Sequence, residues 1–222
     1  MNRITLSSVA GFYKRSAGIL PTILRCALAG LAFYSLWGGE RFVPILSAVS
    51  LAISFIARDF TRKHPGAGDW DLVVTSLLFF HTFFGVGLDF YRRVPHYDKV
   101  LHFSWAVFIG LSVWRALLFF SRQIGRVMAA HSSMLLVIPL VFSLGGLWEI
   151  VEFLIDQVVA LPHPAQIDLC DTMCDLIANL IGAIFATGLI WVYLKKAGTQ
   201  ETDEVGRGIN LVFLSGGKRD GD

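Results

Sequence analysis

The sequence predicts an all-α polytopic membrane protein, a bundle of about six transmembrane helices. Its 222 residues are 55% hydrophobic and only 16% charged, and the mean hydropathy is +0.61. Soluble domains typically carry about 25% charged residues. Several apolar segments approach or reach the roughly 20 helical residues that cross a membrane. This composition argues against an ordinary soluble domain, and the basic residues flank the apolar segments rather than forming a nucleic-acid-binding patch.

The predicted spans follow one another along residues 1–196, which we take as one transmembrane domain. The first span runs past the small residues at 27–29, so we expect a transmembrane helix there rather than a cleaved signal peptide. Arg25 and Arg115 lie toward span ends, where we expect their side chains to reach the interface. Residues 197–222 turn polar and are expected to form a flexible cytoplasmic tail. The approximate span ranges are 18–37, 42–57, 71–90, 98–120, 134–158 and 172–194.

The positions of Lys and Arg orient the bundle. If the N-terminus is cytoplasmic, ten basic residues fall in cytoplasmic loops and helix ends. Four fall on the outer side, namely Arg41, Arg92, Arg93 and Lys99. Because cytoplasmic loops are enriched in Lys and Arg, we expect both termini in the cytoplasm.

Acidic residues follow a different pattern. From Val127 to Leu194 there is no Lys or Arg, although this stretch contains six acids. A charged side chain at the centre of a membrane helix costs roughly 2.5–3.5 kcal/mol even on a lenient scale. An acid such as Glu149, near the middle of the fifth span, therefore indicates a functional site by default. The six acids are Glu149, Glu152, Asp156, Asp168, Asp171 and Asp175.

Four of the spans carry polar residues on one face at helical spacing. On the fifth span, Glu149, Glu152 and Asp156 lie within about 60° of one another at 100° per residue. The predicted orientation brings all four polar faces to the outer end of the bundle, so we expect a polar pocket that opens outward. The other faces are Asp171, Asp175 and Asn179 on the sixth span, Asp98 and His102 on the fourth, and His81 and Asp89 on the third.

The expected pocket offers groups for catalysis, binding or metal coordination. So many carboxylates need compensation: some hold a proton, a basic side chain approaches, or a cation binds. Because His and carboxylate ligands suit zinc and manganese, a divalent metal is a possible cofactor. Its candidate ligands, Glu149, Glu152, His102 and Asp175, are also the candidate catalytic residues. The candidate substrate-binding residues are Asp98, Lys99, Asp171 and Asn179, with Lys99 suited to a phosphate.

Many of these residues also have a plain structural interpretation. Asp98 and Asp171 lie near helix starts and can act as caps. His81 can be a buried, hydrogen-bonded histidine, and Glu149 can make an interhelical hydrogen bond. Solvated loop chemistry can account for His163 and Asp168. Helix packing can account for Gly145, Gly146, Gly182, Cys26, Cys170 and Cys174, with a redox or metal role for the cysteines left open.

The motifs "YDKVLHF", "LWEIVEF" and "DTMCDLIANLIGA" resemble those of the YjdF-like bacterial membrane proteins, over roughly residues 97–184. More remotely, the order D-K-x-x-H-F, a Glu within a span, and D-x-x-x-N-x-x-G is similar to that of VanZ-like proteins, which are linked with glycopeptide resistance. This chain departs from the VanZ-like pattern at Glu152, where those proteins tend to have Gln, and it lacks the arginine before their final Asp. The resemblance implies a multi-pass protein of the bacterial inner membrane. It points to Asp98, Lys99, His102, Glu149, Glu152, Asp171, Asp175, Asn179 and Gly182.

Three kinds of function remain open from the sequence. The pocket can bind or process an envelope or lipid-linked substrate. The expected partners are then the lipid bilayer and that substrate. It can instead bind or transport protons or cations, which a polar path to the cytoplasmic face would favour. The protein can also be a structural accessory whose polar face binds a partner helix.

Overall fold

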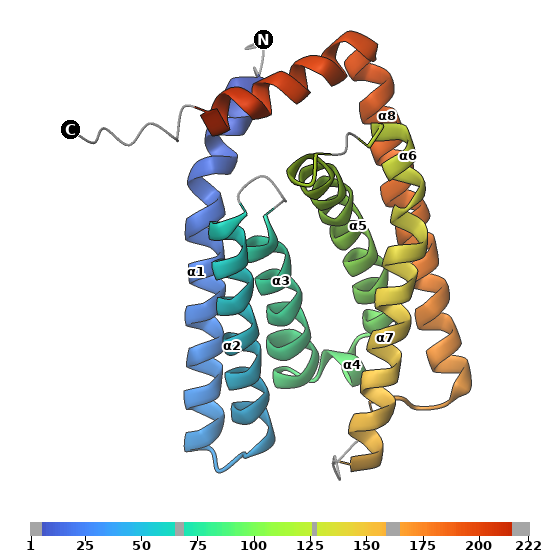
Figure 1. Cartoon of the computed structure of the whole chain (residues 1–222). Helices are drawn as coiled ribbons and strands as arrows, with labels where there is room; N and C mark the ends of the chain where they lie inside the picture. Colours follow the sequence, from blue (N-terminus) through green and yellow to red (C-terminus); the bar gives the residue numbers. More distant parts are fainter. Residues whose placement is uncertain (1–5, 65–68, 126–127, 159–164, 215–222) are drawn as a thin grey trace, which may run out of the picture.

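The computed structural model describes residues 6–64, 69–125, 128–158 and 165–214, with side chains described from Ile19 to Lys195 within these ranges (Figure 1). Every element in the described part is a helix. Figure 1 shows α1, α2 and α3 grouped on one side of the bundle and α5, α7 and α8 on the other. The elements are α1 (Leu6–Trp37), α2 (Phe42–Lys63), α3 (Trp70–Phe79), the π-helix η1 (Phe80–Gly87), α4 (Phe90–Arg93), α5 (Tyr97–Gln123), α6 (Ala130–Leu135), α7 (Val137–Val158) and α8 (Leu169–Leu214).

Six helical segments in the described part are long and apolar enough to cross a membrane, which confirms the predicted fold class. The second span is longer than predicted, because α2 continues beyond residue 57 to Lys63. The spans are Ile19–Trp37, Phe42–Lys63, Trp70–Gly87, Tyr97–Gln123, Ala130–Val158 and Leu169–Lys195.

The bundle has apolar side chains on its surface and many polar ones inside. Large side chains such as Phe33 and Trp37 are 70% and 85% exposed, whereas Ser47, Ser50 and Thr82 are almost completely buried. Ser50 and Thr82 share a hydrogen bond of 2.8 Å between α2 and η1. This distribution suits a hydrocarbon solvent, in which helices associate through small residues and hydrogen bonds.

Arg25 corrects one expectation from the sequence. Its side chain does not extend to the interface but is 5% exposed and lies between α1, α2 and α3. It forms an ion pair with Asp71 and donates to Ser54 Oγ at 2.9 Å and to Thr75 Oγ1 at 3.1 Å. The physical reason is that neighbouring helices offer a carboxylate and hydroxyls, so Arg25 is neutralised within the bundle.

Glycines allow α5 and α8 to approach closely. A Cβ added to Gly182 would lie 2.6 Å from Ala106 Cβ, and one added to Gly110 would lie 2.8 Å from Ala186 Cβ. The packing role predicted for Gly182 is therefore confirmed. Gly145 also has a close neighbour, but a Cβ at Gly146 would meet nothing within 4 Å, so the packing role expected for Gly146 is wrong.

The third span ends in an irregular stretch that shapes the pocket wall. The π-helix η1 widens the turns after Phe79, and Asp89 (φ 63°) and His96 (φ 59°) bracket the short helix α4 in left-handed conformations. Asp and His are among the non-glycine residues that adopt this conformation most readily. The ring of Tyr91 on α4 lies against Gly85, where any Cβ would overlap it.

Helix α8 is much longer than its predicted span. It continues to Leu214, so residues 197–214 of the expected tail are helical, and Figure 1 shows this part turning across the end of the bundle toward α1. Residues 215–222 lie outside the described residues. The flexibility of the tail stays a prediction.

We expect Arg25→Met to lower the free energy of unfolding by about 3–5 kcal/mol, because it leaves Asp71 as an uncompensated buried charge. The double variant Arg25→Met/Asp71→Leu should recover most of this loss, since neither charge remains. Equilibrium unfolding in mixed detergent micelles measures both.

Lys63→Met is the matched control, because Lys63 forms a 2.7 Å pair with Asp59 that is exposed on both sides. It should change stability little. Equal losses for Arg25→Met and Lys63→Met would contradict the role given to the buried pair.

Candidate functional site

Helices α5 and α8 begin, and α7 ends, at the same end of the bundle (Figure 1). Polar side chains of the three helices contact one another there. The Arg25–Asp71 pair lies toward the opposite end, where α3 begins. His102, which is 7% exposed, occupies the centre of the cluster. The close approach of α5 to α8 brings its ring within reach of both neighbouring helices.

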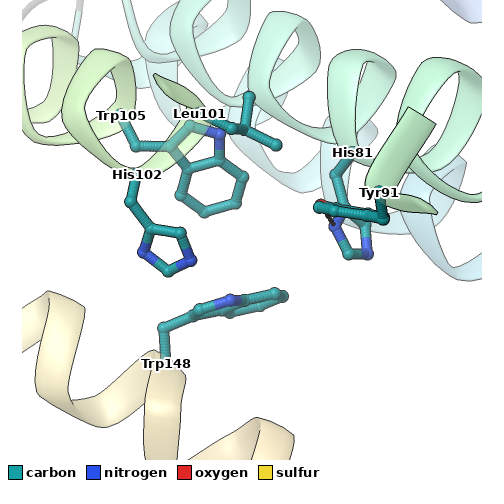
Figure 2. Close-up of a pocket in the computed structure, with 6 residues that line it drawn as sticks. All are labelled: His81, Tyr91, Leu101, His102, Trp105 and Trp148. Carbon is teal, nitrogen blue, oxygen red and sulfur yellow. Dashed lines mark hydrogen bonds between the residues drawn. The ribbon is translucent and has the colours of Figure 1, made fainter. Parts of the chain in front are cut away.

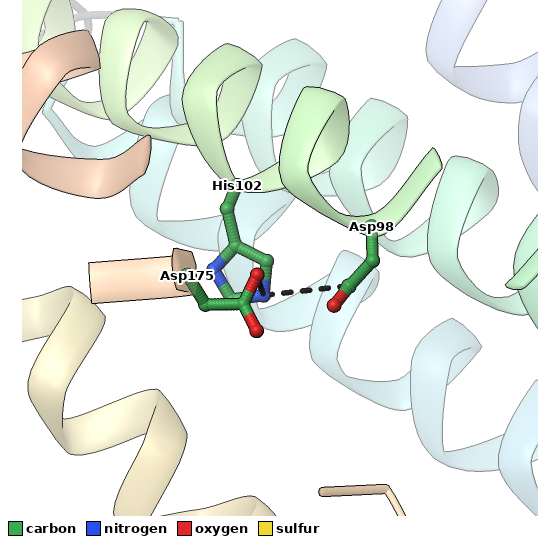
Figure 3. Close-up of side chains that lie close together, drawn as sticks. All are labelled: Asp98, His102 and Asp175. Carbon is green, nitrogen blue, oxygen red and sulfur yellow. Dashed lines mark ion pairs between the residues drawn. The ribbon is translucent and has the colours of Figure 1, made fainter. Parts of the chain in front are cut away.

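Both nitrogens of His102 face acidic side chains. Nε2 lies 3.5 Å from Asp98 Oδ1, one turn earlier on α5, and 3.8 Å from Asp175 Oδ1 on α8 (Figure 3). Nδ1 lies 3.7 Å from Glu149 Oε1 on α7 and 3.1 Å from the side-chain amide of Asn179 on α8. The imidazole therefore separates two groups of carboxylates.

The ammonium of Lys99 contacts three carboxylates of the protein. Its ammonium donates to Asp98 Oδ2 at 3.1 Å and to Asp175 Oδ2 at 2.8 Å, and it forms an ion pair with Asp171. An ammonium has three protons to donate. The expectation that Lys99 meets a phosphate is therefore not supported, because each proton already has a carboxylate acceptor.

The three acids of α7 have three different environments. Glu149 is 4% exposed and faces His102. Glu152 accepts a 2.8 Å hydrogen bond from Trp148 Nε1, one turn earlier on the same helix. Asp156 lies outside the cluster and accepts hydrogen bonds from the backbone N–H groups of residues 165 and 166. Of the predicted polar face of α7, Glu149 and Glu152 therefore belong to the pocket, and Asp156 contacts the following loop.

Gln166 is a pocket residue that the sequence did not indicate. Its side-chain amide donates to Glu149 Oε2 at 3.1 Å and to the Glu149 carbonyl at 2.9 Å. Asp156 holds the Gln166 backbone N–H at 2.9 Å. A neutral loop residue has no helical spacing or charge to reveal it, so only its contact with Glu149 identifies it.

Two buried carboxylate oxygens in the cluster have no hydrogen-bond partner, Glu149 Oε1 and Asp175 Oδ1. Buried polar atoms are nearly always paired, so an exception calls for an explanation, such as an ion or a functional role. Among the described residues, two sets of three side chains each have ligand atoms within 4.8 Å of one another. One set is Asp98, His102 and Asp175, and the other is His102, Glu149 and Glu152. The four predicted metal ligands are thus near one another, but they are divided between two sets that share His102.

A small aromatic cavity adjoins His102, lined also by His81, Tyr91, Leu101, Trp105 and Trp148 (Figure 2). Burial raises the pKa of the Tyr91 phenol well above its usual range, and the charge of Asp98 adds to this effect. Tyr91 therefore keeps its proton at neutral pH, and its hydroxyl lies 2.6 Å from His81 Nδ1. This contact supports the plain interpretation of His81 as a hydrogen-bonded histidine.

The family described as "Predicted membrane protein (DUF2238)" matches residues 19–196, a range that contains all six apolar spans. The chain belongs to the DUF2238 family. It is 35% identical over 127 residues to an uncharacterized protein of Thermotoga maritima, over 57% of this chain and 63% of that protein. The matched stretch therefore spans less than two thirds of the relative's length. No solved structure matches the chain.

Other predicted residues of this DUF2238 protein lie at the margin of the site or away from it. Asp168 caps α8 by accepting from Asp171 N–H at 2.8 Å. Asp89 does not face His81: it pairs with Arg92 and Arg93 on α4, and the hydrogen bond from Arg92 holds its pKa below the usual range. His163 lies outside the described residues. The cysteines Cys26, Cys170 and Cys174 are free and exposed.

We expect Asp156→Ala to loosen the segment that carries Gln166. The substitution removes the acceptor of the residue 165 and 166 N–H groups, and a hydrogen bond to a charged group contributes roughly 1.5–3 kcal/mol. Amide hydrogen exchange at these two residues should accelerate about tenfold or more, as measured by mass spectrometry.

Asp168→Ala serves as the control, because it removes a different acceptor, that of Asp171 N–H. Its effect should appear at Asp171 and leave residues 165 and 166 unchanged. Unchanged exchange at 165 and 166 in Asp156→Ala would contradict the anchoring role.

Proposed function

We propose that this DUF2238 membrane protein binds a divalent cation between α5, α7 and α8, through His102 Nδ1, Glu149 and Glu152. The cation in turn binds the anionic head group of an envelope or lipid-linked substrate. His102, Glu149 and Glu152 offer one nitrogen and two carboxylate oxygens, a set that suits zinc or manganese. Asp175 and Asn179 complete the pocket on the side of α8.

The observation that carries this proposal is that one carboxylate oxygen of Glu149, Oε1, is buried without a hydrogen-bond partner. This oxygen lies 3.7 Å from His102 Nδ1. Two ligand atoms of a tetrahedral ion with bonds of 2.0–2.2 Å lie roughly 3.4 Å apart. A cation between the two atoms would supply the missing partner and needs little movement of either side chain.

The surroundings of Glu149 and Glu152 support the same assignment. Gln166 holds the other oxygen of Glu149, and Trp148 holds one oxygen of Glu152, which leaves an oxygen of each carboxylate for the ion. Neutral partners that orient ligands in this way are typical of metal sites. Binding through Nδ1 requires the Asn179 amide to release it, at a cost of about 0.5–1.5 kcal/mol for one hydrogen bond.

The proposed orientation places this pocket on the outer side of the bacterial inner membrane, with both termini in the cytoplasm. The resemblance to the YjdF-like bacterial membrane proteins supports an envelope location. A bound divalent cation would neutralise the two carboxylates of Glu149 and Glu152, and it would polarise a phosphate or carbonyl oxygen as a Lewis acid. His102 and the acids would then be close enough to exchange protons with the bound group.

Cation or proton transport is the second candidate, and the buried Arg25–Asp71 pair favours it. This pair, with Ser54 and Thr75, forms another polar cluster toward the opposite end of the bundle. Transport requires a polar connection between the two ends. Uptake of protons or metal into proteoliposomes distinguishes it from simple binding.

Elemental analysis of the purified protein tests the proposal. We expect about one equivalent of zinc or manganese in the wild type and almost none in Glu149→Gln, because the amide removes the charged ligand. Asp59→Asn is the matched control, since it neutralises an exposed acid on α2 far from the pocket and should keep the metal.

Metal absent from both the wild type and Glu149→Gln would refute the cation site. If Glu149→Gln also lowered abundance or assembly with no change in ligand binding, the structural accessory role would be supported instead.

A further inference from the structure

We propose that the ammonium of Lys99 prevents a metal ion from binding beside Nε2 of His102, where Asp98 and Asp175 lie (the Asp98–Asp175 edge). The pocket then holds one metal ion, beside Nδ1 (the Glu149–Glu152 edge), and not two. This inference rests on the proposed metal site at the Glu149–Glu152 edge. It assigns Lys99 a part in setting metal stoichiometry, in place of the substrate-binding part expected from the sequence.

The two edges of His102 are alike in geometry. At one edge, Nε2 lies 3.5 Å from Asp98 Oδ1 and 3.8 Å from Asp175 Oδ1. At the other, Nδ1 lies 3.7 Å from Glu149 Oε1. All three separations are near the roughly 3.4 Å between ligands of a tetrahedral ion. Asp175 is 2% exposed and its Oδ1 has no hydrogen-bond partner, as is true of Glu149 Oε1. Geometry alone would therefore admit an ion at each edge. A neutral imidazole has one free lone pair, so two ions would share His102 only if its N–H proton were lost to solvent and the ring bridged them as an imidazolate.

Fixed charge distinguishes the two edges. Lys99 contacts Asp98 and Asp175 through their Oδ2 atoms, so its ammonium lies one carboxylate away from an ion bound to the Oδ1 atoms. At the other edge the neighbours are the neutral Gln166 and Trp148 side chains. Repulsion between charges at such short range is strong in a medium of low dielectric constant. A divalent ion is therefore disfavoured at the edge that Lys99 occupies.

The Asp98–Asp175 edge already has its ligand atoms directed at His102. The Oδ2 atoms of Asp98 and Asp175 contact Lys99, whereas both Oδ1 atoms face the His102 ring (Figure 3). Asp171 binds the same ammonium but belongs to neither set of ligand atoms. Removing the ammonium should expose a second set of ligands that needs a cation.

The test measures the number of metal ions bound per protein in variants that distinguish the effect of net charge from the effect of losing a metal ligand. Lys99→Met keeps an apolar stem but leaves three acids without a counter-charge, so it is studied with a second substitution that restores the net charge. Lys99→Met/Asp171→Asn keeps Asp98, His102 and Asp175. Lys99→Met/Asp175→Asn has the same net charge but lacks one ligand.

After equilibration with zinc and removal of free metal, we expect one equivalent in the wild type and two in Lys99→Met/Asp171→Asn. We expect one in Lys99→Met/Asp175→Asn. Adding Glu149→Gln to the Asp171→Asn pair should leave one equivalent, held at the Asp98–Asp175 edge. In the Asp171→Asn pair, zinc should also raise the melting temperature beyond the shift seen in the wild type.

One equivalent in both double variants would overturn the inference while leaving the proposed metal site intact. No metal in the wild type, with none lost in Glu149→Gln, would overturn the proposed function itself. Because the two double variants carry the same charge, a fold damaged by loss of Lys99 would affect both. A difference between them therefore reports ligation by Asp175.

Discussion

A charge inside a membrane is stable only when other groups of the protein neutralise it, and this constraint organises the bundle into two polar clusters. A single uncompensated charge at the centre of a helix costs roughly 2.5–3.5 kcal/mol. In the first cluster, Arg25 finds Asp71 and the hydroxyls of Ser54 and Thr75. Its charge is neutralised there, so this cluster links α1, α2 and α3.

The second cluster differs because it contains more acids than bases. Lys99 neutralises part of the charge from α5 and α8, and the hydrogen bonds to Glu149 and Glu152 of α7 come from the neutral side chains of Gln166 and Trp148. Since the stretch from Val127 to Leu194 contains no Lys or Arg, α7 and the membrane part of α8 cannot supply the missing positive charge themselves. A polar cluster with this imbalance is suited to bind a cation or protons.

Small residues make the second cluster possible. A Cβ at Gly145 would lie 2.6 Å from the Asn179 amide nitrogen, so the glycine leaves room for the side chain that contacts His102 Nδ1. Gly182 allows α8 to lie against α5 near Ala106, one turn after His102. The spacing of acids in the sequence and the glycines beside them therefore serve the same site.

The sequence by itself determined the six apolar helices, the acidic faces of the last spans and the end of the bundle at which they meet. These features depend on hydrophobicity and on the 3.6-residue period, which are local properties of the chain. Only the tertiary structure decided which group neutralises which. In the folded protein Arg25 points inward and pairs with Asp71, and Lys99 pairs with three aspartates. The carboxylates lie at two different edges of His102, and Gln166 contacts Glu149. The tertiary structure also removed Asp89 from the predicted face of His81, because η1 interrupts the helical period between them. Which side chains contact one another depends on how the helices cross and how closely they pack. The spacing of residues along one helix does not determine either of these.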